Sequence, residues 1–242
     1  MMNLAPRLLL SAILLALLAL LPVSVSAGMT PAEVTAFESC KAQAENGDVG
    51  AQNTLGLCYY FGRGVAKDYV QAVNLWRHGA NRGDAYAQHL LAHRYATGEG
   101  VAKDPMEAVN LWRKSANQGN AKAQFELGSC YFFGRGVEKD EVEAYAYWSI
   151  AGITFDSARM SLAMIEKEVP NYIIQLGKQR AKQLQKEIEV TNVTKSTEAN
   201  ILARKSPGVV VTKPAPGVTE TPPTRSGDTL DDKMNSLFGR KK

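Results

Sequence analysis

Apolar and small residues recur three and four positions apart along the middle of the chain, a spacing that predicts amphipathic helices. In the first such stretch these residues are Ala51, Leu55, Cys58 and Tyr59. The same pattern returns twice, each time after 36 residues. A fixed period of this size indicates a stacked array of small helical units.

The three units are Gly47–Arg82, Gly83–Gln118 and Gly119–Thr154. Several positions carry the same residue in every unit, and the tryptophans and tyrosines among them are expected to pack in a common core. These positions are Ala51/Ala87/Ala123, Gln52/Gln88/Gln124, Leu55/Leu91/Leu127, Tyr59/Tyr95/Tyr131, Ala72/Ala108/Ala144 and Trp76/Trp112/Trp148.

Each unit is predicted to form two helices, because a good N-cap residue precedes each apolar stretch. The predicted caps are Asp48, Asp84 and Asn120 for the first helices and Asp68, Asp104 and Asp140 for the second. Three residues after the second caps come Gln71, Glu107 and Glu143, the spacing of a capping box.

The segment between the two helices reads FGRGVAKD at residues 61–68. Glycines and a lysine also occur in phosphate-binding loops, but those need GxxxxGK after a strand, and no strand pattern precedes any of the three copies. We therefore interpret the segment as a turn. Gly62 is predicted to end the first helix in a left-handed conformation, and Gly64 to let the chain pass close to a neighbour.

Both ends of the array are predicted to be capped. Residues 36–47 match the second-helix pattern, and residues 28–46 are interpreted as a half-repeat. Residues 155–192 are expected to form C-terminal capping helices, with Asp156 as the N-cap of one helix and Pro170 opening a longer one.

Residues 193–242 are rich in Pro, Gly and Thr and are predicted to be a disordered tail. Its last part, residues 228–242, has apolar residues on one helical face and a basic end. This part is expected either to stay unstructured or to fold as a short helix on a groove or an anionic membrane surface.

These units resemble the Sel1-like repeat family, a relative of the tetratricopeptide arrays. The family pattern is roughly A-x-A-Q-x-x-L-G-x-x-Y-x-x-G-x-G-V-x-K-D followed by A-x-x-W, and residues 51–68, 87–104 and 123–140 reproduce its first part. One departure is Ala92, where the other units have glycine, and it is expected to be mild. Another is Phe155, where a glycine would start a fourth unit.

The resemblance implies an all-α solenoid, wound as a right-handed superhelix with a concave face. It also implies a scaffold or adaptor that binds other proteins. Cysteine-rich relatives are associated with β-lactam binding, so the alternative is a ligand-binding or hydrolytic protein that acts on the cell wall or on β-lactams.

The charge distribution argues against a nucleic-acid binder. The net charge is +4, and residues 195–242 carry this whole excess, whereas the repeats are close to neutral. A nucleic-acid-binding fold is expected to concentrate basic residues on its folded part.

The N-terminus, residues 1–27, has the pattern of a secretory signal peptide. Arg7 precedes an apolar run from Leu8 to Leu21, and small residues end at Ala27. The run is shorter than the ~20 residues of a membrane span. Cleavage after Ala27 is therefore favoured over an uncut anchor, and the protein is expected to be periplasmic or secreted.

No residue is predicted to be catalytic, to bind a cofactor or to hold a metal. His89 and His93 share a helix face, but a third ligand is not evident, so a solvated or partner-facing patch is favoured over a metal site. The motifs Ser-x-x-Lys, H-E-x-x-H and G-x-S-x-G do not occur. Cys40, Cys58 and Cys130 are expected to be buried thiols, with no disulfide between the first two.

The predicted partner surface consists of first-helix positions that differ between units, on the helices expected to line the concave face. The varying positions are Asn53, Thr54, Leu57 and Phe61; His89, Leu90, His93 and Thr97; and Phe125, Glu126, Ser129 and Phe133. The selected candidates are Asn53, Leu57, Phe61, His89, His93, Thr97, Phe125, Ser129 and Phe133. Exposed apolar side chains there would indicate protein contact, whereas partly packed phenylalanines would not.

The sequence therefore predicts an exported, non-enzymatic adaptor that binds a protein or peptide and no nucleic acid. A membrane-surface protein that uses residues 228–242 is the third hypothesis.

Overall fold

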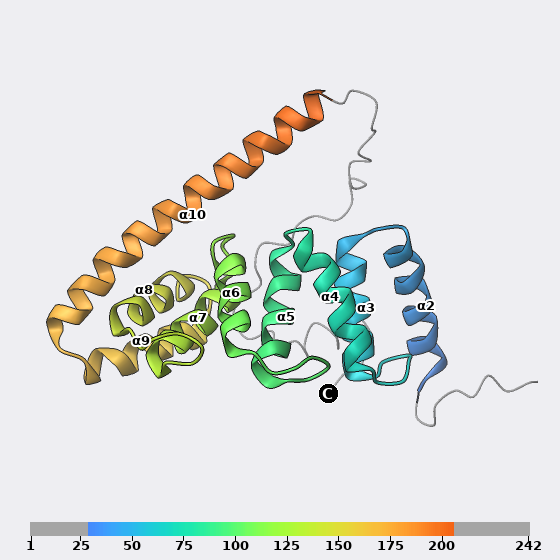
Figure 1. Cartoon of the computed structure of the whole chain (residues 1–242), viewed down its shortest axis with the longest axis horizontal. Coiled ribbons are helices and arrows are strands. Elements are labelled where there is room, and N and C mark those ends of the chain that lie inside the picture. Colours follow the sequence, from blue (N-terminus) through green and yellow to red (C-terminus); the bar gives the residue numbers. More distant parts are fainter. Residues whose placement is uncertain (1–28, 206–242) are drawn as a thin grey trace, which may run out of the picture.

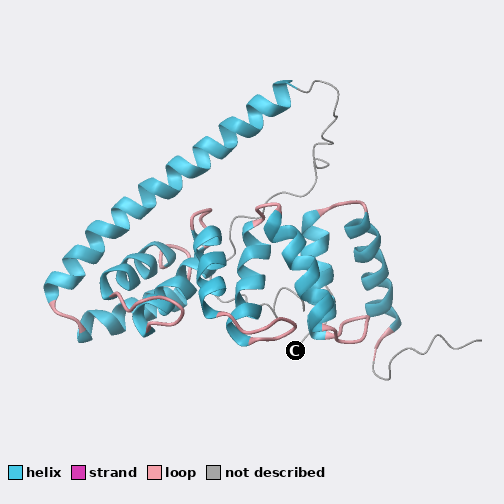
Figure 2. Ribbon diagram, in the orientation of Figure 1, coloured by secondary structure: helices cyan, strands magenta, loops and turns pink. Residues whose placement is uncertain are grey.

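The structure is a computed structural model that describes residues 29–205, and within this range every regular element is a helix (Figures 1 and 2). The predicted all-α class is thereby confirmed. The helices are α2 (Pro31–Glu45), α3 (Val49–Phe61), α4 (Tyr69–Asn81), α5 (Ala85–Thr97), α6 (Pro105–Ala116), α7 (Ala121–Phe133), α8 (Glu141–Ala151), α9 (Asp156–Glu168) and α10 (Asn171–Lys205).

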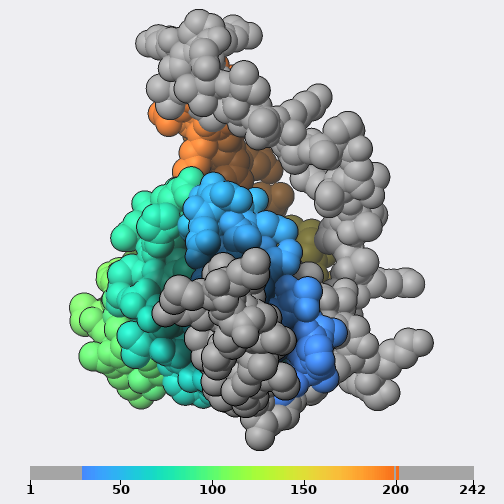
Figure 3. Space-filling view, turned by 90° about the vertical axis from the view of Figure 1, so that its right-hand side faces the viewer, coloured from blue at the N-terminus to red at the C-terminus, as the bar shows by residue number. Residues whose placement is uncertain are grey.

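The helices stack as a solenoid in which each helix from α2 to α9 packs mainly on its neighbours in sequence. The three repeats are the hairpins α3–α4, α5–α6 and α7–α8 (Figure 1). The half-repeat helix α2 covers one end of the array, and Figure 3 looks onto this end. At the other end α8 contacts both α9 and α10.

The glutamine shared by all three repeats joins each first helix to the helix before it. The Nε2 groups of Gln52, Gln88 and Gln124 donate to carbonyls of Ala44, Ala80 and Ala116 at 3.2, 3.3 and 3.2 Å. Each acceptor lies in the last turn of the preceding helix, where carbonyls lack an intrahelical partner. The alanine before each glutamine is buried, which allows the two helices to approach closely.

The predicted caps are confirmed at all six repeat helices. The side chains of Asp48, Asp84 and Asn120 accept from the backbone N–H three residues later. Those of Asp68, Asp104 and Asp140 do the same at the second helices. Each bond satisfies one of the N–H groups that a helix start leaves unpaired.

The glycine-containing segment between the two helices of each repeat forms a turn, as predicted. Gly62 ends α3 with φ +71°. A Cβ at Gly64 would lie 2.2 Å from the carbonyl oxygen of Glu33, so only glycine fits there without movement. Gly100 and Gly136 make the same approach to the start of the preceding second helix, so the second glycine of each loop fixes the contact between repeats.

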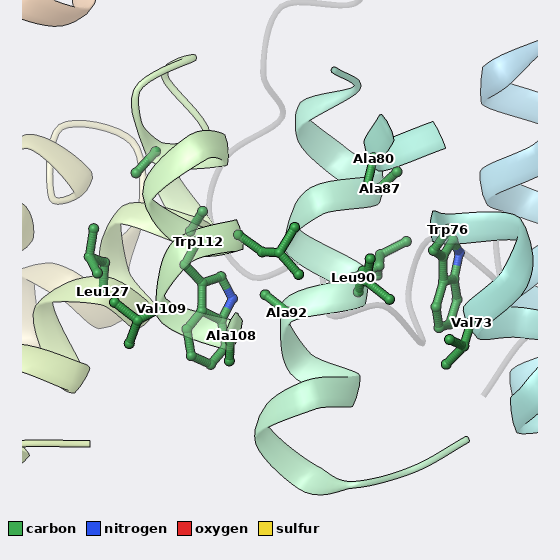
Figure 4. Packing of buried hydrophobic residues seen from close by; sticks show 14 of the residues in the cluster. Val73, Trp76, Ala80, Ala87, Leu90, Ala92, Ala108, Val109, Trp112 and Leu127 are labelled. Carbon is green, nitrogen blue, oxygen red and sulfur yellow. The ribbon is translucent and has the colours of Figure 1, made fainter. Parts of the chain in front are cut away.

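The tryptophans are core residues, as expected. Trp76, Trp112 and Trp148 are all buried, and Figure 4 shows the first two among the alanine, valine and leucine side chains of the core. Trp76 Nε1 donates to the carbonyl of Asn53 at 3.2 Å. Trp148 Nε1 makes the equivalent bond to Phe125 at 3.1 Å.

The C-terminal helix is longer than expected, because α10 continues past the predicted boundary at Val193 to Lys205. Between these residues the chain has no proline or glycine, and Thr194 and Thr197 return their hydroxyls to carbonyls four residues earlier. The first helix-breaking pair, Pro207–Gly208, comes only after Lys205.

The cap of α9 also differs from the expectation. Asp156 is the first helical residue, and Phe155 occupies the N-cap position without a side-chain cap bond. Asp156 instead forms an ion pair with Arg159 one turn later. The predicted signal peptide, the tail after Lys205 and its terminal amphipathic segment lie outside the described residues.

Candidate binding pocket between the second and third repeats

A pocket of about 560 Å³ lies at the junction between the second and third repeats. Its wall combines the end of α5, the inner side of α6, the second half of α7 and the loops that precede α6 and follow α7. The lining includes His93, Ala96, Lys103, Trp112, Glu126, Ser129 and Arg135.

The second repeat lacks an aromatic ring that its neighbours have at this place. Tyr60 in the first repeat and Phe132 in the third each pack on the tryptophan of their own repeat, with ring centroids 5.9 and 5.3 Å apart. The matching residue of the second repeat is Ala96. Its methyl group leaves Trp112 without this ring, and both residues line the pocket.

A second replacement changes the environment of the same tryptophan. A Cβ at Gly56 or Gly128 would lie 2.4 or 2.7 Å from the indole nitrogen of the tryptophan in that repeat. Ala92 carries such a Cβ, and Figure 4 shows it on the part of α5 that faces Trp112. The indole N–H of Trp112 is buried and has no hydrogen-bond partner among the described residues. The change from glycine to alanine at position 92 was expected to be mild. In the structure it is accompanied by a buried indole N–H that has no hydrogen-bond partner among the described residues.

His93 lies between this tryptophan and a carboxyl group. Its ring packs edge-on against Trp112 with centroids 5.3 Å apart, and its Nε2 is 3.5 Å from Oε1 of Glu126. Burial lowers the pKa of His93 to about 4, and the nearby charges of Arg94 and Lys122 act in the same direction. The imidazole is therefore neutral at neutral pH.

The pKa of the Glu126 carboxyl group is shifted in the opposite direction. Burial raises its pKa to about 7, although Arg135 acts against this shift. Close to neutral pH the group exists as a mixture of the protonated form, which can donate a hydrogen bond, and the ionised form, which can only accept.

Two cations complete the pocket. In the first and third repeats the matching lysine contacts the side chain two residues later, the ring of Tyr69 at 5.7 Å and the carboxylate of Glu141 at 2.8 Å. In the second repeat that position is Pro105, which offers Lys103 neither contact. Among the described residues, neither Lys103 nor Arg135 forms an ion pair.

The structure brings some of the predicted partner-binding residues together at this pocket. His93, Thr97 and Ser129 belong to its lining. Phe133, at the end of α7, is 57% exposed, and the guanidinium of Arg135 lies 4.6 Å from the centre of its ring. Phe133 therefore presents an apolar surface next to a residue that lines the pocket.

Other predicted residues are buried and do not form an open surface. Asn53, Leu57 and His89 are almost inaccessible. Asn53 Nδ2 donates to Oδ1 of Asp84 at 2.8 Å and so joins two repeats. Burial lowers the pKa of His89 well below its ordinary value. The expectation of a partner-facing His89 is corrected: first helices touch the helices before and after them, and these neighbours cover such positions.

The remaining two phenylalanines are half-buried. Phe125 packs edge-on against Phe155 at 5.2 Å, and Phe61 packs against Tyr60 at 4.9 Å. For these two, partial packing is the better interpretation.

Sequence reasoning did not select several residues of the pocket, namely Lys103, Trp112, Glu126 and Arg135. Glu126 belonged to the varying set, but the others match the family pattern or lie in the loops. The available signal was Ala96, a small residue where both neighbouring repeats have a ring.

The cysteines are free thiols, and Cys58 and Cys130 are buried. Burial raises the pKa of both to about 12, which disfavours the reactive thiolate. Between residues 29 and 205, no cluster of three or more His, Cys, Asp or Glu side chains is arranged to hold a metal ion. In the same range, no helix is both long and apolar enough to span a membrane.

The fold and the pocket define a class of protein, a helical-repeat solenoid with a binding cavity between two of its repeats. A family model for the Sel1 repeat matches residues 49–84, 85–120 and 121–152, which correspond closely to the three hairpins. The chain therefore contains three Sel1 repeats, and proteins of the Sel1-repeat family commonly serve as protein-interaction scaffolds.

Two solved structures support this assignment. One is described as a protective antigen present in uropathogenic Escherichia coli strains displaying an SLR fold; it is 30% identical with a TM-score of 0.58. The similarity covers 67% of this chain but only 35% of that protein. The other is a Sel1 repeat protein from Oxalobacter formigenes, 29% identical with a TM-score of 0.52, covering 62% of this chain and 64% of that one. A comparison with curated proteins finds no match.

Proposed function

We propose that this protein is an exported, non-enzymatic adaptor that binds a peptide segment of another protein at the pocket between the second and third repeats. The observation that carries the proposal is the pocket itself. It opens where the repeat pattern is broken at Ala92 and Ala96, and it combines a tryptophan, an exposed apolar neighbour and polar side chains. Such a mixture is typical of sites that bind small groups specifically.

Export is the part of the proposal that rests on the N-terminal pattern. Residues 1–27 combine a basic start, an apolar run and small residues at the end. Mass spectrometry of the protein recovered from its host is expected to give an N-terminus at Gly28. A chain that retains Met1 would contradict cleavage.

Peptide binding is tested with a displayed library of random peptides selected on the full chain. A matched pair of variants locates the site: Ser129→Trp places a large ring in the pocket, and Lys114→Trp places the same ring on the exposed side of α6. Selected peptides are expected to bind the wild type and Lys114→Trp equally. They are expected to lose at least about tenfold in affinity for Ser129→Trp, the equivalent of about 1.4 kcal/mol.

Two results would overturn the proposal. One is a selection that yields no peptide with saturable binding. The other is a set of peptides that bind Ser129→Trp as tightly as the wild type, because such peptides would use another surface.

A further inference from the structure

We propose that the pocket between the second and third repeats recognises a carboxylate of the bound peptide, held between Lys103 and Arg135. This inference rests on the proposed function and adds the chemical class of the group that enters the pocket. An acidic side chain and a free C-terminus both present a carboxylate, so both are considered as its source.

The two cations are the first argument. Lys103 and Arg135 lie on different loops, yet both line the same pocket. In the neighbouring repeats the matching lysine has a partner two residues later, and Lys139 also lies 5.7 Å from the centre of the Phe132 ring. Pro105 and Ala96 replace these partners in the second repeat, so Lys103 has neither kind of contact. A lysine and an arginine together suit a peptide carboxylate, because each hydrogen bond to it is charge-assisted.

The indole N–H of Trp112 is the second argument. It is buried, it has no partner among the described residues, and its ring forms part of the pocket wall. An unpaired buried donor destabilises the free protein, so a small shift of the indole towards an acceptor oxygen of the ligand would make a hydrogen bond that the fold leaves unmade. The first and third repeats make this bond internally and have no such donor to offer.

The other ionisable groups near the site favour an anion at acid to neutral pH. His93 faces Glu126 from α5, while the neighbouring Arg94 is paired with Glu99. Lys122 and Cys130 lie on α7, and Lys103 and Arg135 lie on the two loops. Protonated Glu126 can donate to a carboxylate, and ionised Glu126 repels it. Because burial raises the pKa of Glu126 to about 7, affinity for an anionic peptide should fall as the pH rises through this value.

The test uses fluorescent peptides of apolar residues and glycine that are identical except for one group. They carry an internal glutamate or glutamine, and a free or amidated C-terminus. Binding to the full chain is measured by fluorescence anisotropy at about pH 6 and about pH 8, on either side of the pKa of Glu126. In parallel, NMR follows the three indole N–H signals, of which only that of Trp112 is expected to move.

We expect a peptide with a carboxylate to bind at least about tenfold more tightly than its neutral twin, which corresponds to one or two charge-assisted bonds. Arg135→Gln and Lys103→Gln should each remove most of this preference. Both side chains are exposed, so the fold is retained, as circular dichroism will verify. Glu126→Gln should abolish the change between the two pH values.

Comparison of the peptides identifies the source of the carboxylate. A preference for internal glutamate assigns an acidic side chain, and a preference for the free terminus assigns the end of a chain. If neutral twins bind as tightly as acidic ones, or if both cation variants keep the full preference, the carboxylate inference is wrong while peptide binding stands. If the acidic peptides bind without moving the Trp112 indole signal, the assignment to this pocket is wrong.

Discussion

At position 96 a methyl group stands where the neighbouring repeats place an aromatic ring, and at position 92 a methyl group stands where they have none. The first difference leaves space beside Trp112, and the second accompanies the loss of its hydrogen bond. Protein interiors are close-packed, so a single missing ring is enough to leave a cavity. The space beside Trp112 thus follows from Ala96, and the unpaired indole N–H accompanies Ala92.

Filling the cavity should remove the binding site and stabilise the fold. In Ala96→Phe the new ring takes the place that Phe132 occupies over Trp148 in the third repeat. Cavity filling of this kind raises the free energy of unfolding by roughly 0.5–2 kcal/mol. Thermal unfolding and peptide binding, measured beside Lys114→Phe as an exposed control, check this. A variant that binds peptide normally would show that the ligand lies elsewhere.

Restoring the glycine at position 92 should restore the internal hydrogen bond. In Ala92→Gly the indole of Trp112 can approach α5 as Trp76 does, and its N–H should donate to the carbonyl of His89. The hydrogen bond gains about 1 kcal/mol, while glycine inside a helix costs a similar amount, so stability changes little. The readout is hydrogen exchange of the Trp112 indole, which should become slower; unchanged exchange would refute the proposed cause.

The two ionisable groups of the pocket predict opposite pH dependences of stability. The pKa of His93 falls from 6.5 in the unfolded chain to about 4, so its stabilising contribution is present above about pH 6.5 and is lost as the pH falls towards 4. The pKa of Glu126 rises from 4.5 to about 7, so its contribution is present below about pH 4.5 and is lost as the pH rises through 7.

Replacing each group should flatten one side of the stability profile. In His93→Leu, which carries the residue of the first repeat, the loss of stability between about pH 6.5 and 4 should shrink. In Glu126→Gln the loss between about pH 4.5 and 7 should shrink instead. Urea unfolding across this range measures both. If the stability profiles of both variants run parallel to that of the wild type, burial does not shift the pKa of either group.

At the scale of the helical element, the hairpin depends on capped helices and on glycines at two kinds of position. Gly62 and its counterparts need a positive φ to end a helix, and Gly64 and its counterparts also let two backbones touch. These features follow from the sequence because they are local. The end of α10 could not be predicted in this way. A helix continues until a residue ends it, and threonines alone do not end a helix.

Two glycine substitutions separate the close approach from the positive φ. Gly100 and Gly83 both have positive φ, but a Cβ at Gly100 would meet the carbonyl of Tyr69 at 2.3 Å, whereas one at Gly83 meets nothing within 4 Å. Gly83→Ala should cost about 1–2 kcal/mol for the left-handed conformation alone. Gly100→Ala should cost clearly more, as measured by chemical denaturation. Equal losses would show that this contact between repeats can yield easily.

At the scale of the whole molecule, a regular array holds one irregular junction. The fold was predictable because residues that recur at a fixed period have the same structural role in every repeat. The glutamines join neighbouring helices, the caps begin the helices and the tryptophans lie in the core. The pocket was only partly predictable. Varying first-helix positions include His93 and Ser129, which line it, but also Leu57 and His89, which neighbouring helices cover. Burial between stacked repeats depends on three-dimensional packing that a one-dimensional period does not contain.

The most direct measurement is an NMR map of the full chain titrated with a peptide selected for binding. The chemical-shift changes are predicted to cluster on the end of α5, the inner side of α6 and the second half of α7, and to include the indole N–H of Trp112 but not those of Trp76 and Trp148. Changes that spread evenly over all three repeats, or that centre on α2 or α10, would contradict a single binding site at the junction of the second and third repeats.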